Sequence, residues 1–310
     1  MIKPFILKCI KFVILFFLTY IFLIWFWAEF ASKKHKPNLL YNFEGSGYTY
    51  TRLIEVENYS NLDILFTGSS HAYRGFDTEI FRENNYYTFN LGSSSQTPIQ
   101  IEILLNEYIN KLNPKLIIIE VYPWTFTSDG LESTLDIIAN SKNFLLNTKL
   151  MLNQKHIKSF NSYIYWIYNY LTLKNTDFVQ PKIIKDHKYI DGGYVKRDLD
   201  YFIPEKSIEK KEWIFNNKQF EALGRIVKKF RTDSTKILLV QAPITKFLYN
   251  SYNNNSEFDM KISKYGKYIN FNHISELVDT TDFYNDDHLN QNGVEKFNRD
   301  LIEILNQLNL

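Results

Sequence analysis

The sequence contains a single cysteine, Cys9, among 310 residues. One cysteine excludes an intramolecular disulfide and a metal site built from several thiolates. It is also no bacterial lipoprotein signal, because Ile6, Leu7 and Lys8 precede it where small residues would be required. The formal net charge is only +2, so no global field favours a nucleic-acid partner. Internal repeats, coiled-coil heptads and low-complexity tracts are absent as well.

Apolar side chains are plentiful, at 45% of the sequence, whereas 23% of residues are charged. These proportions are typical of a chain that buries a full core. A chain of 310 residues can hold one membrane anchor and one large domain.

The longest apolar run extends from Phe12 to Ala28. A helix of roughly 20 apolar residues crosses the hydrocarbon core, and Trp25 and Trp27 lie at one end, where indoles favour the membrane boundary. Residues 1–30 therefore predict a single transmembrane anchor. A cleaved signal peptide is disfavoured, because Ala28-Glu29-Phe30 has a bulky residue where the small-x-small cleavage pattern requires a small one.

Lysines flank the anchor on both sides: Lys3, Lys8 and Lys11 before it, and Lys33, Lys34 and Lys36 after it. The positive-inside rule is therefore nearly tied on orientation. Residues 31–60 have no sustained period and predict a linker or stalk, packed in part on the following domain.

Residues 61–310 alternate strand-like and helix-like patterns, which predicts an α/β domain with a parallel sheet. Five runs are expected to be strands: Ile64 to Gly68, Tyr86 to Gly92, Lys115 to Pro123, Lys236 to Pro243 and, more weakly, Tyr268 to Phe271. Helical spacing appears in 98–112, 218–231 and 292–308. Residues 124–215 are expected to form a helical and loop insertion over the edge of the site, with a turn at Asp191 to Tyr194.

Polar residues follow several predicted strands where their carboxyl ends share one edge of the sheet, the usual ligand-binding edge. Ser70 follows the first strand, Gly92 ends the second, and His288 follows the fifth. A serine hydroxyl with an imidazole base can perform acyl transfer. Asn285 or Asp286 would orient the imidazole, and the amides of Ser70 and Gly92 would bind the oxyanion.

Each of these signals has a simpler interpretation when taken alone. Gly-Ser-Ser after an apolar run is usually a turn or a helix cap, and a lone histidine such as His288 is usually not catalytic. Together, in this chain order and before a terminal helix, they favour an active site. His71 is expected at the rim of the site. Glu120 is either an acid of the site or a surface residue at the end of its strand, and the second position is favoured.

These residues resemble the motifs of the SGNH/GDSL hydrolases. Gly68-Ser69-Ser70 is similar to their nucleophile block, Asn90-Leu91-Gly92 to their oxyanion block, and Asn285 to His288 to their terminal Asp-x-x-His block. Among these enzymes, the anchored chain resembles bacterial cell-surface members such as the teichoic-acid D-alanine transfer protein and polysaccharide O-acetyltransferase accessory proteins. The resemblance implies a flavodoxin-like three-layer α/β/α fold, and ester chemistry without a metal or cofactor.

Two features depart from that family. Asn285 stands where the family has aspartate, so either Asp286 supplies the charge or the activity is low. Glu120-Val121-Tyr122-Pro123 stands where the family has Gly-x-Asn-Asp, which leaves a third oxyanion donor unassigned, with the Tyr122 hydroxyl as one candidate.

The leading hypothesis is a membrane-anchored serine esterase or O-acyltransferase that acts on a cell-envelope polysaccharide or related glycan. The resemblance implies an extracytoplasmic catalytic domain and a membrane-bound O-acyltransferase partner. The alternative is a non-catalytic accessory protein in a polysaccharide modification or export complex. A lipid esterase that works at the bilayer is a third possibility.

Overall fold

A computed structural model of the chain describes residues 2–36, 38–43, 45–174, 177–204 and 209–308. Its centre is a five-stranded parallel sheet in the order β2-β1-β3-β7-β8. The strands are β1 (Ile64–Thr67), β2 (Thr88–Asn90), β3 (Leu116–Glu120), β7 (Lys236–Gln241) and β8 (Tyr268–Asn270). The predicted α/β class and five-stranded parallel sheet are confirmed, and this strand order is that of flavodoxin-like folds.

Strand β1 lies inside the sheet, between β2 and β3. Ile64 is paired with Thr88 on one side and Leu116 on the other, so the three carboxyl ends reach the same edge. All four residues of β1 are buried. Burial on both faces explains why this strand is a continuous apolar run and not an alternating one.

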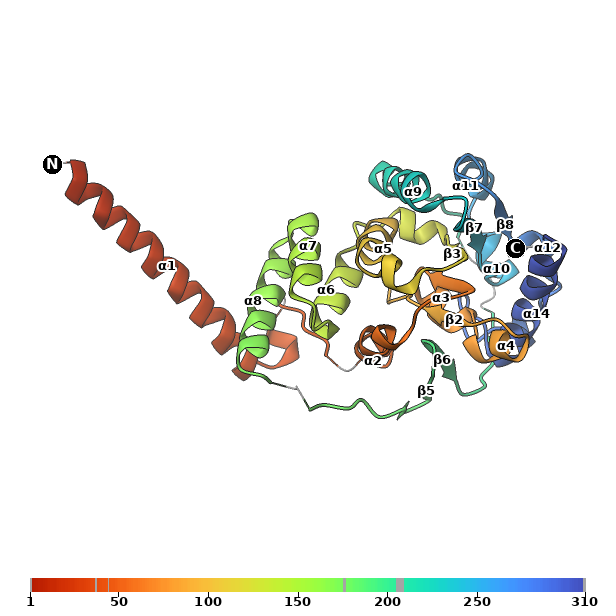
Figure 1. The fold of residues 1–310 in the computed structure, drawn as a ribbon, viewed down its shortest axis with the longest axis horizontal. Coiled ribbons are helices and arrows are strands. Elements are labelled where there is room, and N and C mark those ends of the chain that lie inside the picture. The colour runs from red at the N-terminus through yellow and green to blue at the C-terminus, as the bar shows by residue number, and fades with distance from the viewer. Residues whose placement is uncertain (1, 37, 44, 175–176, 205–208, 309–310) are drawn as a thin grey trace.

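Helices cover both faces of the sheet and complete three layers (Figure 1). One face packs on α5 (Pro98–Leu112), α9 (Asn217–Phe230) and α11 (Asn255–Ile262). The other face packs on α3 (Ser70–Gly75), α4 (Thr78–Glu83) and α14 (Gln291–Gln307). Short helices α10 (Lys246–Tyr249), α12 (Phe271–Ile274) and α13 (Asp279–Asp282) lie in the loops that follow β7 and β8.

The segment 124–215 contains more regular structure than its sequence indicates. After η3 (Pro123–Phe126) come helices α6 (Leu131–Asn140), α7 (Phe144–Gln154) and α8 (Ile157–Leu171). Then β4 (Ile183–Ile184), β5 (His187–Ile190) and β6 (Tyr194–Arg197) form a small antiparallel sheet. The predicted turn joins β5 to β6. A Cβ on Gly193 would lie 2.3 Å from the Asn90 carbonyl oxygen, which requires a glycine there.

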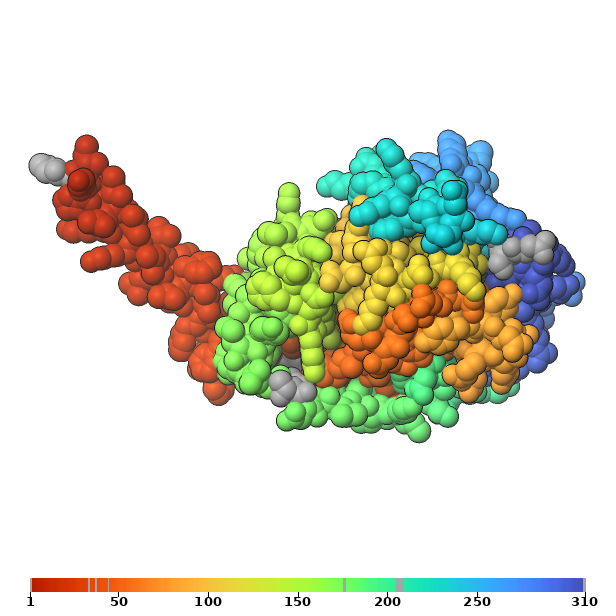
Figure 2. Space-filling view, in the orientation of Figure 1, coloured from red at the N-terminus to blue at the C-terminus, as the bar shows by residue number. Residues whose placement is uncertain are grey.

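The amino-terminal helix α1 (Ile2–Phe30) projects away from the domain (Figure 2). Among the described residues, its last third packs on α8 and Leu39. Helix α1 is long and apolar enough to cross a membrane. Within the predicted linker 31–60, η1 (Lys33–His35) is followed by α2 (Thr49–Glu55) and η2 (Val56–Asn58). Helix α2 buries Arg52, whose guanidinium donates to the Gly193 carbonyl, so this part packs on the domain. Helix α2 has only 7 residues, too few for a helical period of apolar side chains to be recognised in the sequence.

Candidate active site

The turn between β1 and α3 presents Ser70 at the edge of the sheet. Gly68 has φ +146°, and a Cβ there would lie 2.6 Å from Cβ of Glu120, so only glycine fits this turn. Ser69 caps α3, because its hydroxyl accepts a hydrogen bond from the His71 amide. Ser70 is therefore the first residue of α3, directly beyond the strand end.

The structure brings Ser70 and His288 together although 218 residues separate them. Ser70 Oγ lies 2.8 Å from His288 Nε2, within hydrogen-bond distance. The side chain of His288 is 15% exposed, so the pair is partly open to solvent. This geometry permits direct proton transfer from the hydroxyl to the imidazole.

The loop before α14 orients the other nitrogen of His288. Asn285 Oδ1 accepts the His288 backbone amide at 2.8 Å and lies 3.2 Å from His288 Nδ1. Asp287 Oδ1 lies closer to Nδ1, at 2.5 Å, in an ion-pair contact that lacks hydrogen-bond geometry. Asparagine and carboxylate therefore share the role of holding Nδ1.

The carboxylate at His288 is that of Asp287, which corrects the prediction that Asp286 supplies it. Asp287 directly precedes His288, and its side chain folds back onto the adjacent ring. The backbone carbonyl of Asp286 instead accepts hydrogen bonds from the amide and hydroxyl of Thr245, which fixes the loop beside α10.

His71 is buried beneath the site and does not lie at its rim as the sequence predicted. Its ring is stacked on His288 with centroids 4.8 Å apart and planes 6° from parallel. Its Nε2 lies 2.6 Å from the Asp287 carbonyl oxygen, so it donates a hydrogen bond there. Neighbouring side chains at the start of a helix point in different directions, and in α3 the side chain of His71 points inward, under the loop that carries His288.

Glu120 is also buried, which corrects its expected position at the surface. Its Oε2 accepts from the amide and the hydroxyl of Ser69, at 3.1 Å and 2.8 Å. The Ser69 hydroxyl in turn lies 3.2 Å from His71 Nδ1. The single hydroxyl proton of Ser69 goes to Glu120, so Glu120, Ser69 and His71 form a row of close polar contacts that ends in the hydrogen bond from His71 to the backbone of Asp287.

Burial sets the charges of these groups. It lowers the pKa of His71, and the nearby His288 lowers it further, so the His71 ring is neutral at pH 7. Burial raises the pKa of Glu120. Burial also acts to raise the pKa of Asp287, but the contact with His288 outweighs it, and that pKa lies well below its usual range. Asp287 thus carries the charge that Asn285 lacks.

The Gly92 amide, one of the two predicted oxyanion donors, is engaged within the chain. The Gly92 amide donates to Asn90 Oδ1 at 3.1 Å and is not directed at Ser70. The Asn90 side chain also donates to the Ala72 carbonyl at 2.8 Å, so this asparagine ties the end of β2 to α3. The amide of Ser70 lies in the first turn of a helix, where backbone N–H groups lack helical acceptors.

A cleft of about 400 Å³ opens onto Ser70 and His288. It is lined also by residues from β6 and from the loops after β2 and β3, among them Arg197, Ser94, Ser95, Tyr122 and Trp124. The Tyr122 ring packs on His71 with centroids 4.2 Å apart, so it supports the stacked imidazoles from below.

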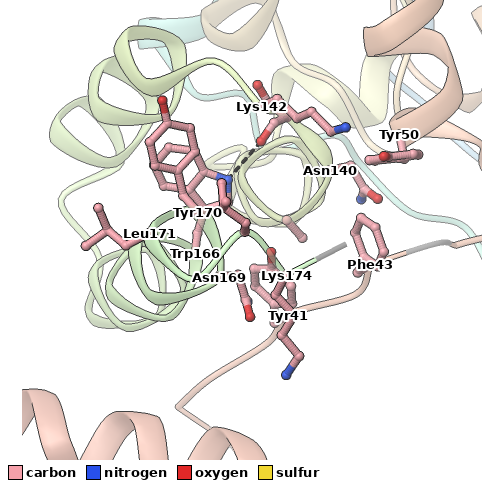
Figure 3. Close-up of a pocket in the computed structure, with 13 residues that line it drawn as sticks. Tyr41, Phe43, Tyr50, Asn140, Lys142, Trp166, Asn169, Tyr170, Leu171 and Lys174 are labelled. Carbon is pink, nitrogen blue, oxygen red and sulfur yellow. Dashed lines mark hydrogen bonds between the residues drawn. The ribbon is translucent and has the colours of Figure 1, made fainter. Parts of the chain in front are cut away.

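A second hollow of similar size, about 380 Å³, lies between α6, α8 and the side chains of Tyr41, Phe43 and Tyr50 (Figure 3). Aromatic side chains such as Tyr41, Phe43 and Trp166 form its walls. No histidine is among the described residues that line it, so it offers no nucleophile with an imidazole base.

His71, Asp287 and His288 could in principle be metal ligands, because their ligand atoms lie within 4.8 Å of one another. The geometry is unsuited to a shared ion. Imidazole lone pairs lie in the plane of the ring, and the two rings are stacked in nearly parallel planes, so their lone pairs do not converge. Nε2 of His288 already lies against Ser70, and Nε2 of His71 against a carbonyl.

No protein-family model and no curated protein matches the chain. Among solved structures, the chain is similar to a crystal structure from Bacteroides fragilis named "putative acylhydrolase", with 10% sequence identity and a TM-score of 0.35. The alignment covers 85% of this chain and 97% of that one. At this score the likeness carries no argument about activity, which must come from the site itself.

Proposed function

We propose that this chain is a serine-dependent esterase or O-acyltransferase that works through an acyl-serine intermediate. The observation that carries the proposal is the 2.8 Å contact between Ser70 Oγ and His288 Nε2 in an open cleft. Asp287 and Asn285 at Nδ1 complete a nucleophile, a base and its orienting groups. The sequence motifs that resemble SGNH hydrolases support the same chemistry.

In the proposed reaction, Ser70 Oγ attacks the acyl carbonyl carbon while its proton passes to His288 Nε2. The Ser70 amide donates to the oxyanion, and the hydroxyls of Ser94 and Ser95 are the cleft groups available for a second hydrogen bond. As the ester C–O bond breaks, His288 returns the proton to the departing alkoxide oxygen. Water or a sugar hydroxyl then attacks the acyl-serine, again with its proton passing to His288. As the bond between Ser70 Oγ and the acyl carbon breaks, His288 returns the proton to Ser70 Oγ.

The test is hydrolysis of 4-nitrophenyl acetate by the detergent-solubilised full chain. Ser70→Ala and His288→Ala should each abolish turnover, whereas Ser263→Ala, an exposed serine on another surface, should not. A fluorophosphonate probe should label the parent at Ser70 and leave Ser70→Ala unlabelled. Equal rates for the parent and Ser70→Ala would remove Ser70 from the mechanism.

The alternative is a non-catalytic accessory protein of a polysaccharide modification or export complex. Its specific support is the Gly92 amide, which is engaged by Asn90 where an oxyanion donor is expected. Asn285 in place of aspartate is a second departure. Absence of fluorophosphonate labelling in the folded full chain would favour this function over the enzyme.

We also propose that α1 anchors the domain in a membrane and that α8 lies against the lipid beside it. Tyr20 and Trp25 of α1 contact Asn161 and Tyr168 of α8. Ile157 and Leu171 share this side of α8, by the spacing of a helix, and are more than half exposed: 51% and 72%. An apolar face continuous with the anchor is suited to the membrane interface.

Two measurements test this placement. The full chain should stay in the membrane fraction after alkaline carbonate extraction, and a chain lacking residues 2–30 should not. Protection of a carboxyl-terminal tag from protease added to the cytoplasmic face would support an extracytoplasmic domain. In that topology the resemblance favours a cell-envelope glycan as substrate and a membrane-bound O-acyltransferase as partner, which co-purification can test.

A further inference from the structure

Two arginines line the candidate catalytic cleft side by side. Arg74 comes from the last turn of α3, and Arg197 ends β6. Arg74 Nη1 and Arg197 Nε each lie 3.3 Å from the same atom, Nδ1 of His187. One imidazole nitrogen therefore accepts from both guanidinium groups and holds them close together.

His187 cannot neutralise these charges. It is buried, and burial together with the two arginines lowers its pKa to about 4, so the ring is uncharged at pH 7. With Nδ1 as acceptor, the proton resides on Nε2, which faces Asp186 Oδ1 at 3.5 Å. Asp186 is thus on the far side of the ring from the arginines.

Neither Arg74 nor Arg197 forms an ion pair with a carboxylate among the residues that the structure describes. Their other close neighbours are aromatic. Arg74 lies over the Tyr73 ring at 5.1 Å from its centroid, and Arg197 over Tyr284 at 4.2 Å. The rings fix the orientation of the guanidinium groups, and the charge of Asp186 acts on Arg197 through space without forming an ion pair with it.

Holding two like charges together has an electrostatic cost. Burial lowers the pKa of Arg197, and the charge of Arg74 lowers it further. An anion bound between the two would relieve the repulsion, and a guanidinium fork matches the oxygens of a carboxylate, sulfate or phosphate. The carboxylates of Glu132 and Asp287 also line the cleft, so the arrangement would bind one small anionic group at the two arginines and not a uniformly acidic surface.

We propose that Arg74 and Arg197 form a subsite that binds an acidic group of the acylated substrate, next to the ester that Ser70 attacks. The proposal rests on the proposed function and deepens it, because it selects esters of acidic glycans over neutral ones. His187 is then a positioning residue, which keeps the two arginines at the spacing that the acidic group needs.

The test is inhibition of 4-nitrophenyl acetate hydrolysis by sugars that differ in charge. A galacturonic acid trimer should inhibit the full-length parent, whereas a neutral galactose trimer at the same concentration should not. Inhibition by inorganic phosphate is measured separately. Inhibition by phosphate but not by the acidic trimer would indicate a phosphate site and not a carboxylate site. Inhibition by the acidic trimer should also weaken as salt is added.

Substitutions of single arginines test whether Arg74 and Arg197 bind the acidic trimer. Arg74→Gln and Arg197→Gln should each weaken inhibition by the acidic trimer about tenfold, the value of one lost charge-assisted hydrogen bond. Far-UV circular dichroism and Tm values like those of the parent show that the variants fold. Arg82→Gln, on the exposed surface of α4, is the matched control and should bind like the parent. Equal inhibition by acidic and neutral trimers, or unchanged inhibition in both cleft variants, would overturn the subsite.

Binding can be measured without turnover, which separates this inference from the proposed function. Saturation-transfer NMR on full-length Ser70→Ala should detect the acidic trimer, and the signal should be lost in the double variant Ser70→Ala, Arg74→Gln. If the parent shows no esterase activity but binds the acidic trimer, the proposed enzyme function is refuted and the anion site is not. Activity on neutral ester without trimer binding would refute the anion site alone.

Discussion

The ring of His71 lies parallel to the ring of His288, with centroids 4.8 Å apart. Two imidazoles this close could not both be charged without strong repulsion, and burial keeps His71 neutral. His288 can therefore accept the proton of Ser70 without a second cation beside it. The hydrogen bond from His71 to the Asp287 carbonyl also fixes the loop that carries His288.

Replacing His71 with phenylalanine should slow catalysis without abolishing it. The flat ring would keep the stacking but lose the hydrogen bond to the Asp287 backbone. We expect kcat to fall about tenfold, the value of one buried hydrogen bond, with KM for 4-nitrophenyl acetate nearly unchanged. Steady-state kinetics checks this. An unchanged kcat would show that the loop holds His288 in place unaided.

Asp287 and Asp286 offer a matched pair of neighbouring carboxylates. Asp287→Asn should lower kcat about 100-fold or more, because the imidazolium loses the negative charge beside Nδ1. Asp286→Asn should lower kcat by a smaller factor, since the carboxylate 2.5 Å from His288 Nδ1 is that of Asp287. The reverse order of the two effects would return the orienting role to Asp286.

Metal removal should leave the activity intact. His71 and His288 lie in nearly parallel planes, so they cannot direct their nitrogens at one ion. Dialysis of the full chain against EDTA should therefore leave the rate of ester hydrolysis and the extent of fluorophosphonate labelling unchanged. A loss of activity that zinc restores would identify His71, Asp287 and His288 as ligands instead.

The sheet and its order of elements could be predicted because buried parallel strands are continuous apolar runs, such as Ile64 to Thr67. The small antiparallel sheet was not predictable in the same way. Its strands have two to four residues, and apolar and polar side chains alternate only weakly along them. Of this sheet, only the Gly192-Gly193 turn between β5 and β6 could be predicted from the sequence.

At the site, the proximity of Ser70 and His288 follows from strand ends that share an edge, which topology alone predicts. The roles of Asp287 and His71 depend on local side-chain directions in a turn and at a helix start. The pairing of Arg74 with Arg197 depends on β6, which lies in the segment where the sequence is least regular. These features could be identified only in the three-dimensional structure.

A buried aspartate outside the site predicts how stability depends on pH. Asp77 is 4% exposed, caps α4 by accepting the Glu79 amide, and burial raises its pKa from 3.8 to about 6. The folded state therefore binds this proton more tightly than the unfolded state. Its contribution to stability is greatest below about pH 4 and is lost as pH rises through about 6, a change of about 3 kcal/mol.

Asp77→Asn should remove that dependence, because asparagine caps helices as well as aspartate and carries no charge. In the detergent-solubilised full chain, the difference in Tm between pH 5 and pH 7.5 should become smaller or change sign relative to the parent. Asp233→Asn, at an exposed aspartate, should leave the parent difference as it is. If Asp77→Asn instead lost stability equally at both pH values, the carboxylate would be stabilising the fold in its charged form, and burial would not be the force that sets its pKa.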